Sequence, residues 1–354
     1  MDFEAIVIGA GPAGCATAIT LADRGHHTLL VGDIAVGHTW AGESLPPGAA
    51  DLVTAVFDDG VLDHAVHRSA YGVRAAWGSD ELVSMDFITH PDGDGWHVDR
   101  ALFDARLVAA AQARGVEIVT ARVKPALRDG AQWRVTLGTR DATARWMVDA
   151  TGRGGGPLRP VVGARHAHDA QVALVALARQ TAPSAAVTTI ESTPVGWWYS
   201  TPTPDGPVVI ALVTDHDVLP PPGRRTHWWH ERLQETHHIA GLADAMRCEP
   251  AVHAAGTVHR EGLWGDGWAL AGDAAIAWDP LSSQGMVTAI LMGSRLGDAI
   301  SRFSAGDGDA LPDWERDYLM LLDEHLGLRA HYWSIEQRWG GHPFWDRRRP
   351  LSAP

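Results

Sequence analysis

The chain has 354 residues, 45% of them hydrophobic, and a formal net charge of −14 at pH 7. This length can bury a sizeable core or two fused domains, and the acidic balance argues against a nucleic-acid partner. Cys15 and Cys248 are too few for a disulfide framework or a metal motif. The N-terminus shows no targeting pattern and no segment is apolar enough to span a bilayer, so we expect a cytoplasmic protein without membrane association.

The predicted elements begin with a βαβ unit, made of a buried strand at 5–8, a helix at 13–24 and a second strand at 28–31. Turn signals and changes in hydrophobic periodicity place the later elements. In chain order these are a helix at 101–113, strands at 116–120, 133–137 and 146–149, a strand-rich antiparallel region at 172–213, a strand at 268–271, a long helix at 283–303, and a mostly helical tail at 314–339.

A glycine-rich turn joins the first predicted strand to the first helix. Its sequence, GAGPAG, matches the dinucleotide fingerprint G-x-G-x-x-G in the required context. Gly9 allows the tight turn, Gly11 lets the backbone approach a pyrophosphate, and Gly14 lets helix and strand pack closely. Gly32 stands where an acid normally binds the ribose; Asp33, one place later, either turns in to do so or is a loop residue. The expected contacts in this unit are Gly9, Gly11, Pro12, Ala13, Gly14 and Asp33.

Three further segments favour FAD over a nicotinamide cofactor. Asp273 directly follows a buried strand, where its carboxylate can accept hydrogen bonds from ribityl hydroxyls. Residues 279–286, DPLSSQGM, lead into a helix whose N-terminus can stabilise the charge of reduced flavin, although their serines would also simply cap that helix. Arg100, at another helix start, is placed to reach a phosphate or ribityl oxygen. The expected contacts here are Arg100, Gly272, Asp273, Pro280, Gln284, Gly285 and Met286.

These segments resemble class A flavoprotein monooxygenases, in the branch that includes geranylgeranyl reductases and tryptophan halogenases. The segment GESLPP at 42–47 looks like the G-E-x-x-x-P of that branch, VDATGR at 148–153 like its D-A-T-G, and GWWYSTP at 196–202 like a degenerate G-W-x-W-x-I-P. We therefore also place Glu43 and Ser44 at the flavin.

A closer resemblance is to LodB-like flavoproteins, which modify tryptophan in protein precursors of quinone cofactors. It covers nearly the whole chain and is carried by the segments at 77–79, 95–100, 279–285 and 344–348. The resemblance implies that reduced flavin and dioxygen form a C4a-hydroperoxide, which hydroxylates an electron-rich aromatic substrate of the indole or tryptophan type, free or peptide-borne.

Two other activities are alternatives within this branch. Halogenases of the branch use a lysine in the region after the G-E-x-x-x-P segment, but no lysine lies between Glu43 and Lys124, the one lysine of the chain. Arginine cannot substitute for a titrating amine, so we disfavour a halogenase. A flavin-dependent reductase or desaturase without oxygen insertion is the second alternative.

Candidate catalytic and substrate-binding residues come from the same segments. Trp197, Trp198 and Tyr199 would either line an aromatic substrate pocket or form a buried strand. Glu43 is the preferred acid–base residue, with ribityl binding or helix capping as its alternative. His97 is a second catalytic candidate that could instead be structural. The spacing of the histidines fits no common zinc motif, so we expect no metal.

A second dinucleotide fingerprint does not follow. The expected electron donor is therefore NAD(P)H that docks transiently or a partner flavin reductase, with O2 as co-substrate.

The predicted fold is α/β, with a Rossmann-like FAD-binding domain interleaved with a substrate domain of mixed or antiparallel β-sheet, followed by a helical tail. We expect the FAD-binding domain to comprise residues 1–70, 98–165 and 258–305. The substrate domain would comprise 71–97 and 166–257, and the C-terminal helical segment 306–354.

Overall fold

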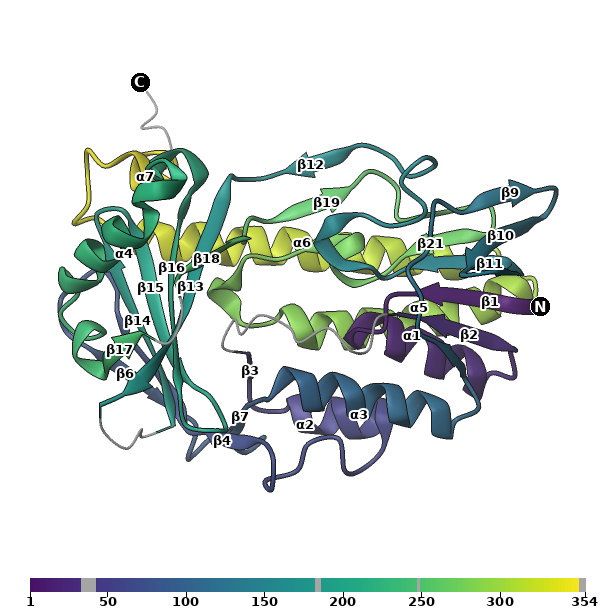
Figure 1. The fold of residues 1–354 in the computed structure, drawn as a ribbon, viewed down its shortest axis with the longest axis horizontal. Helices are drawn as coiled ribbons and strands as arrows, with labels where there is room; N and C mark the ends of the chain where they lie inside the picture. Colours follow the sequence, from purple (N-terminus) through teal and green to yellow (C-terminus); the bar gives the residue numbers. More distant parts are fainter. Residues whose placement is uncertain (33–42, 182–185, 247–248, 350–354) are drawn as a thin grey trace.

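The computed structural model describes residues 1–32, 43–181, 186–246 and 249–349. Three residues singled out above, Asp33, Gly42 and Cys248, lie outside the described residues. Two large sheets dominate the architecture, one at each end of the molecule, and a long C-terminal helix runs between them (Figure 1).

The first sheet has a parallel centre, as the βαβ prediction requires. Strand β1 (Asp2–Ile8) pairs with β2 (Thr28–Val31) on one side and β11 (Arg140–Asp149) on the other. Residues 5–8 of β1 and the whole of β2 are buried, because both faces of a parallel sheet are covered. The other strands of this sheet are β8 (Glu117–Val119), β9 (Leu127–Asp129), β10 (Gln132–Leu137), β20 (Trp264–Gly265) and β21 (Trp268–Leu270).

Helices α1 (Pro12–Asp23), α2 (Ala49–Phe57), α3 (Arg100–Ala113) and α5 (Gly285–Ser304) pack in this half of the molecule. Helix α1 begins one residue before the predicted start, because proline suits the first helical position. The prediction that the last of these helices starts at 283 is wrong. Ser283 adopts a left-handed conformation (φ 51°) after the short turn η6 (Pro280–Ser282), so α5 begins only at Gly285.

The second sheet is antiparallel except where β14 pairs with β5. One face packs on helix α4 (Arg225–Gln234), and the other faces the nucleotide-binding half. Its strands, in spatial order, are β17 (Ala243–Met246), β13 (Gln171–Gln180), β16 (Val208–Asp215), β15 (Gly196–Pro202), β14 (Val187–Thr193), β5 (Gly72–Ala76) and β6 (Val83–Asp86), with β18 (Ala251–Ala254) also on β13.

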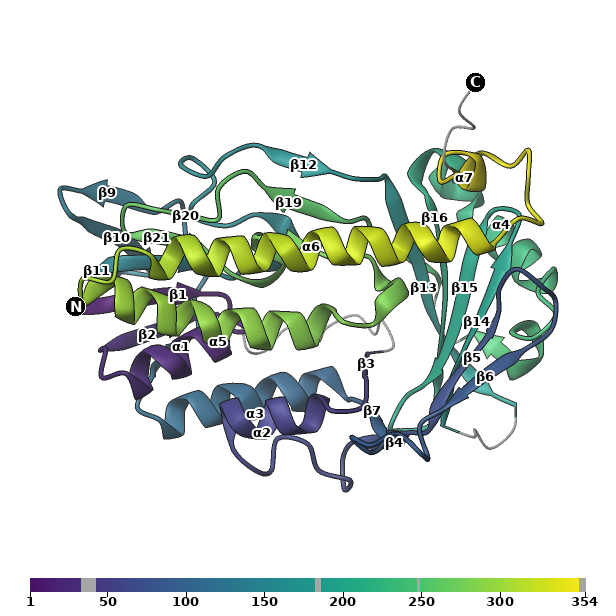
Figure 2. The ribbon, with the colours of Figure 1, turned by 180° about the vertical axis from the view of Figure 1, so that it is seen from behind.

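The tail contains α6 (Ala310–Ile335) and the short α7 (Pro343–Asp346). Helix α6 lies beside α5 and extends from the first half of the molecule to the second sheet (Figure 2). None of the helices in the described ranges combines the length and apolar character needed to cross a bilayer. Two small sheets complete the fold, β3 (Ser44–Leu45), β7 (Gly95–His97) and β4 (Arg68–Ala70) in one, and β12 (Arg165–Ala167), β19 (Val258–Arg260) and β22 (Ile276–Ala277) in the other.

The predicted α/β fold with a mainly antiparallel second sheet and a helical C-terminus is confirmed. The residue boundaries proposed for the domains stay a prediction.

Candidate functional site

A cavity of about 990 Å³ lies between the two halves of the molecule. This volume is at the upper end of the range of roughly 300–1,000 Å³ that is usual for cofactor sites. The turn from Gly9 to Ala13 forms part of its wall, and Thr188, Trp197 and Tyr199 of the second sheet form another part. One continuous space therefore joins the fingerprint turn to the aromatic strand.

The glycine turn has the geometry that a pyrophosphate needs. Gly9 has φ 114°, and a Cβ there would lie 2.2 Å from the carbonyl oxygen of Ala150. A Cβ on Gly14 would lie 1.8 Å from the carbonyl oxygen of Gly9, so this residue allows close packing rather than ligand contact. A Cβ on Gly11 would meet no atom within 4 Å, and Gly11 lines the cavity. The first N–H groups of α1 have no intrahelical partner, so this turn fits a dinucleotide phosphate.

The end of β2 differs from the usual ribose site. A Cβ on Gly32 would lie 2.5 Å from the Cβ of Ala10, which leaves no room for an acidic side chain at that position. Whether Asp33 takes over this contact stays open, since it lies outside the described residues.

An ion cluster of Glu43, Arg100 and Asp104 lies on the cavity wall. The Arg100 guanidinium donates to Glu43 Oε1 at 3.0 Å and to both carboxylate oxygens of Asp104 at 3.0 and 3.2 Å. Burial alone would lower the pKa of Arg100, but the two carboxylates outweigh burial and raise it. Arg100 lines the cavity and its guanidinium holds the Glu43 carboxylate there; direct contact of Arg100 with a flavin oxygen stays a prediction.

Asp273 follows β21 and lies at the cavity, where the sequence predicted a ribityl-binding carboxylate. Arg153 pairs with it at 3.2 Å and also donates to the carbonyl oxygens of Gly256 and Trp278. About a third of the Asp273 side chain is exposed, and this surface faces the cavity. Burial raises the pKa of Asp273, although Arg153 opposes the shift. Ribityl hydroxyls in the cavity would donate to this accessible carboxylate.

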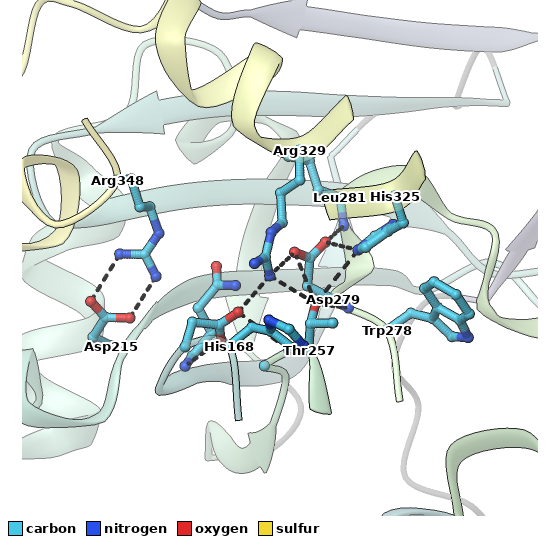
Figure 3. Close-up of polar contacts among 12 residues, drawn as sticks. His168, Asp215, Thr257, Trp278, Asp279, Leu281, His325, Arg329 and Arg348 are labelled. Atoms are coloured by element: carbon cyan, nitrogen blue, oxygen red, sulfur yellow. Dashed lines mark hydrogen bonds and ion pairs between the residues drawn. The ribbon is translucent and has the colours of Figure 1, made fainter. Parts of the chain in front are cut away.

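The segment before α5 is tied to the C-terminal helix by a buried polar network (Figure 3). Arg329 of α6 donates to Asp279 Oδ2 at 2.9 Å, to Thr257 Oγ1 at 2.7 Å, and to Asp169. His325, one turn earlier, lies 3.7 Å from Asp279. Asp279 and the adjacent Pro280 line the cavity, so α6 fixes the loop that is expected to contact the flavin ring.

The aromatic run of β15 divides between the two faces of its sheet. Trp197 and Tyr199 line the cavity. Trp198 points to the opposite face, where its ring contacts Trp229 of α4 at 5.1 Å between centroids. The prediction that Trp198 lines the substrate pocket is wrong, because successive side chains of a strand alternate between faces.

His97 lies behind the cavity wall rather than on it. Its Nδ1 lies 2.9 Å from the hydroxyl of Ser44, which does line the cavity. Burial lowers the pKa of His97 to about 4; a hydrogen bond with the backbone of Ala186 opposes this shift, and the charge of Arg68 adds to it. At neutral pH His97 is therefore an uncharged base linked to the cavity through one hydroxyl.

The depressed pKa of His97 predicts a pH dependence of stability. Unfolded histidine has a pKa of about 6.5, so the contribution of neutral His97 is complete above that pH and is lost as pH falls towards 4. Between pH 7 and pH 4.5 the wild type should lose about 2–3 kcal/mol more unfolding free energy than His97→Gln. Urea titrations at both pH values measure this difference. His227→Gln, at a histidine whose side chain is 82% exposed, should follow the wild type. Equal losses in His97→Gln and the wild type would contradict the assignment.

Most residues predicted for the flavin come together at the cavity, but two do not. Gly14 packs within the turn, and Gln284 precedes α5 without lining the cavity. Many other lining residues were not predicted as contacts, among them Asp104, Thr151, Gly152, Arg153, Trp278, Asp279 and Ser283. The signal for most of them was present, since they lie within or beside the D-A-T-G and DPLSSQGM segments. No group of three or more His, Cys, Asp or Glu side chains in the described ranges could hold a metal ion.

The fold and the cavity together fit a flavoprotein, since a dinucleotide-type turn, a carboxylate after a buried strand and a face of the second sheet meet at one cavity. The chain matches the family described as FAD dependent oxidoreductase over residues 63–298, more than half of its length, and an FAD binding domain over residues 4–53. It therefore belongs to the FAD dependent oxidoreductases and is an enzyme of that class.

Three similar proteins refine this picture. LodB of Marinomonas mediterranea is 26% identical over 99% of this chain and 98% of LodB, which confirms the LodB-like resemblance. The peptidyl tryptophan dihydroxylase QhpG, essential for tryptophylquinone cofactor biogenesis, is 25% identical with a TM-score of 0.82, over 98% of this chain and 79% of QhpG. The myxobacterial chondrochloren halogenase CndH is 24% identical with a TM-score of 0.88, over 99% of this chain and 86% of CndH, and shares the fold.

Proposed function

We propose that this FAD-dependent oxidoreductase is a monooxygenase that hydroxylates an electron-rich aromatic ring of the indole or tryptophan type, free or within a peptide. The observation that carries the proposal is the single cavity that joins the glycine turn and the Asp273 loop to the side chains of Trp197 and Tyr199. Similarity to a peptidyl tryptophan dihydroxylase supports this substrate class.

The reaction consumes O2, two electrons and two protons in addition to the substrate; when NAD(P)H is the donor, its hydride carries both electrons and one of these hydrogens. One oxygen atom enters an aromatic C–H bond, and the other leaves as water. Bound FAD, once reduced, supplies the activation of dioxygen. The electrons come from NAD(P)H directly or from a partner flavin reductase. The aromatic wall positions the substrate ring and excludes water from the space beside the flavin.

Two groups are placed to accept the ring proton that oxygen transfer displaces. Glu43 lines the cavity, and its carboxylate is held by Arg100 at 3.0 Å. Ser44 also lines the cavity, and its hydroxyl is backed by neutral His97 at 2.9 Å. We assign Glu43 as the first proton acceptor. His97 acts through Ser44 and is thus a positioning residue in this scheme.

Halogenation is the less supported alternative. Lys124, the one lysine of the chain, is exposed and is not among the described residues that line the cavity. A halogenase of this branch would need a titrating amine near the substrate, which arginine cannot supply.

The test is isotopic. The FAD-loaded protein is incubated with NADH or NADPH, with a flavin reductase, under 18O2, and with indole, free tryptophan or a tryptophan-containing peptide. We expect a mass gain of one or two 18O atoms on at least one substrate, and no halogen incorporation when bromide is added. Brominated product would contradict hydroxylation in favour of a halogenase. Substrate reduction or desaturation without oxygen gain, persisting under anaerobic conditions, would contradict it in favour of a reductase.

A further inference from the structure

An apolar row leads from the cavity wall to the outer edge of the second sheet. Tyr199 of β15 lies opposite Ile190 of β14. Ile190 in turn lies beside Ala75 of β5, and Ala75 lies opposite Val83 of β6. Residues in register share one face of a sheet. Val83 therefore lies on the same face as Tyr199 and Ile190, both of which line the cavity.

A second row runs parallel to the first. The side chains of Thr201 on β15 and Thr188 on β14 share a hydrogen bond. Thr188 lies beside Val73 of β5, and Val73 lies opposite Met85 of β6. Thr188 again lines the cavity. We call Val73, Ala75, Val83 and Met85 the outer strip, because they continue the cavity wall onto the surface.

The outer strip becomes more exposed with distance from the cavity. Val73 and Ala75 are half-buried, whereas Val83 is 68% and Met85 62% exposed. Ile88, just after β6, is 84% exposed. Exposed apolar side chains that gather in one patch mark an interaction site more often than isolated ones do. Continuity with the cavity indicates that the partner is the molecule whose reactive part enters the cavity.

The length of the strip suits a polypeptide better than a small aromatic compound. Tyr199 and Val83 are three strands apart, which corresponds to roughly 14 Å at the usual spacing between strands. An extended chain covers this distance with about four residues. A polypeptide with an aromatic side chain in the cavity would therefore place residues four or five positions away on Val83 and Met85.

The charge beside the strip is acidic. Glu81 precedes β6 and Asp86 ends it, and Asp92 and Asp94 follow in the next turn. Glu81, Asp86 and Asp92 are exposed, in a chain whose net charge is −14. The Asp86 side chain alternates to the face opposite Met85, whereas Glu81 and Asp92 lie before and after β6 in the chain. Lysine or arginine in a polypeptide that crosses the strip would complement these exposed acids.

From this geometry we propose that the outer strip docks the polypeptide segment beside the target aromatic residue, with apolar side chains four or five positions from that residue and basic side chains beyond them. The inference rests on the proposed function, since it takes the reactive residue to be an aromatic side chain. It adds to that function a surface site for the substrate polypeptide and the register of its recognition.

Binding of synthetic peptides to the FAD-loaded protein tests the docking independently of turnover. The probe is fluorescein-labelled Lys-Lys-Leu-Leu-Gly-Ser-Gly-Trp-Gly-Ser, together with the same sequence in reverse, measured by anisotropy. We expect one of the two peptides, the forward or the reversed sequence, to bind. Replacing its leucines by serine, or its lysines by glutamate, should each weaken binding roughly 10-fold. The double variant Val83→Ser/Met85→Ser should show the same loss, and Glu81→Gln a smaller one. Leu127→Ser, at an exposed leucine of β9 in the other sheet, should bind like the wild type.

The outcomes separate docking from oxygenation. Flavin content and thermal midpoint confirm that each variant is folded. Peptide binding that is equal in the wild type and Val83→Ser/Met85→Ser overturns the docking proposal, whatever the oxygenation assay with indole shows. A wild-type dimer in light scattering that Val83→Ser/Met85→Ser converts to monomer also overturns it, because a second copy would then cover the strip. Strip-dependent peptide binding without oxygen transfer to any aromatic compound supports docking and contradicts only the proposed monooxygenase.

Discussion

Replacing Arg329 by methionine is expected to lower the free energy of unfolding by about 3–5 kcal/mol, because it leaves buried carboxylates without their cation. Asp279 and Asp169 both accept hydrogen bonds from Arg329, and their side chains are only 1% and 8% exposed. Urea unfolding of the flavin-free protein measures the loss without a contribution from FAD binding. Arg295→Met breaks an ion pair with Asp317 in which both side chains are about half exposed, and should cost less than about 1 kcal/mol.

The pH dependence of this deficit distinguishes lost charge pairing from lost packing. Burial alone would raise the pKa of Asp279, but the contact with His325 and the charge of Arg329 outweigh it and hold the pKa below its ordinary value. The wild type gains stability from this pairing above the unfolded pKa of about 3.9 and loses it as pH falls below that value. Without Arg329 the buried Asp279 resists ionisation, so the deficit should be larger at pH 7 than at pH 4.5. A deficit that is the same at both pH values would contradict the charge-pairing account.

Substituting Gly11 by valine is expected to abolish tight FAD binding and to leave the fold intact. Gly11 has φ −83° and ψ −176°, which any residue adopts, and its Cβ would point into open cavity space. The valine side chain would then occupy the space in which the pyrophosphate approaches the backbone. We expect FAD affinity to fall at least about 100-fold, equivalent to about 2.7 kcal/mol, as measured by flavin fluorescence titration.

The matched substitution in the same turn is Gly14→Ala. Its Cβ would lie 1.8 Å from the carbonyl oxygen of Gly9, so this variant should lose stability in the flavin-free protein, whereas Gly11→Val should not. Thermal unfolding without FAD compares the two variants. Wild-type FAD affinity in Gly11→Val would show that the pyrophosphate does not lie at this turn.

Local patterns were sufficient to predict the nucleotide-binding unit. The apolar run at 5–8, the glycine turn and the next apolar run at 28–31 are contiguous, and each has a local physical cause. Alternation along β15 was also available in the sequence. Within the strand-rich region predicted at 172–213, this alternation places Trp198 on the face opposite Trp197 and Tyr199.

The contacts that complete the site could not be predicted in the same way. Arg329 is 50 residues beyond Asp279 and meets it only because α6 lies against the start of α5. The Ser44–His97 pair depends on the register of β3 with β7. The pairing of Arg100 with Glu43 depends equally on tertiary packing, whereas its pairing with Asp104 is a local i,i+4 contact on α3. Periodicity and motifs carry no information about such long-range pairs.

A crystal structure of the FAD-loaded protein with a bound indole compound tests the central claim most directly. The account predicts that the pyrophosphate lies against Gly11 at the start of α1, that the ribityl chain lies near Asp273, and that the indole ring lies between the flavin ring and the side chains of Trp197 and Tyr199. An indole compound bound elsewhere, with protein or solvent between it and the flavin ring, would contradict a shared cavity for oxygen transfer.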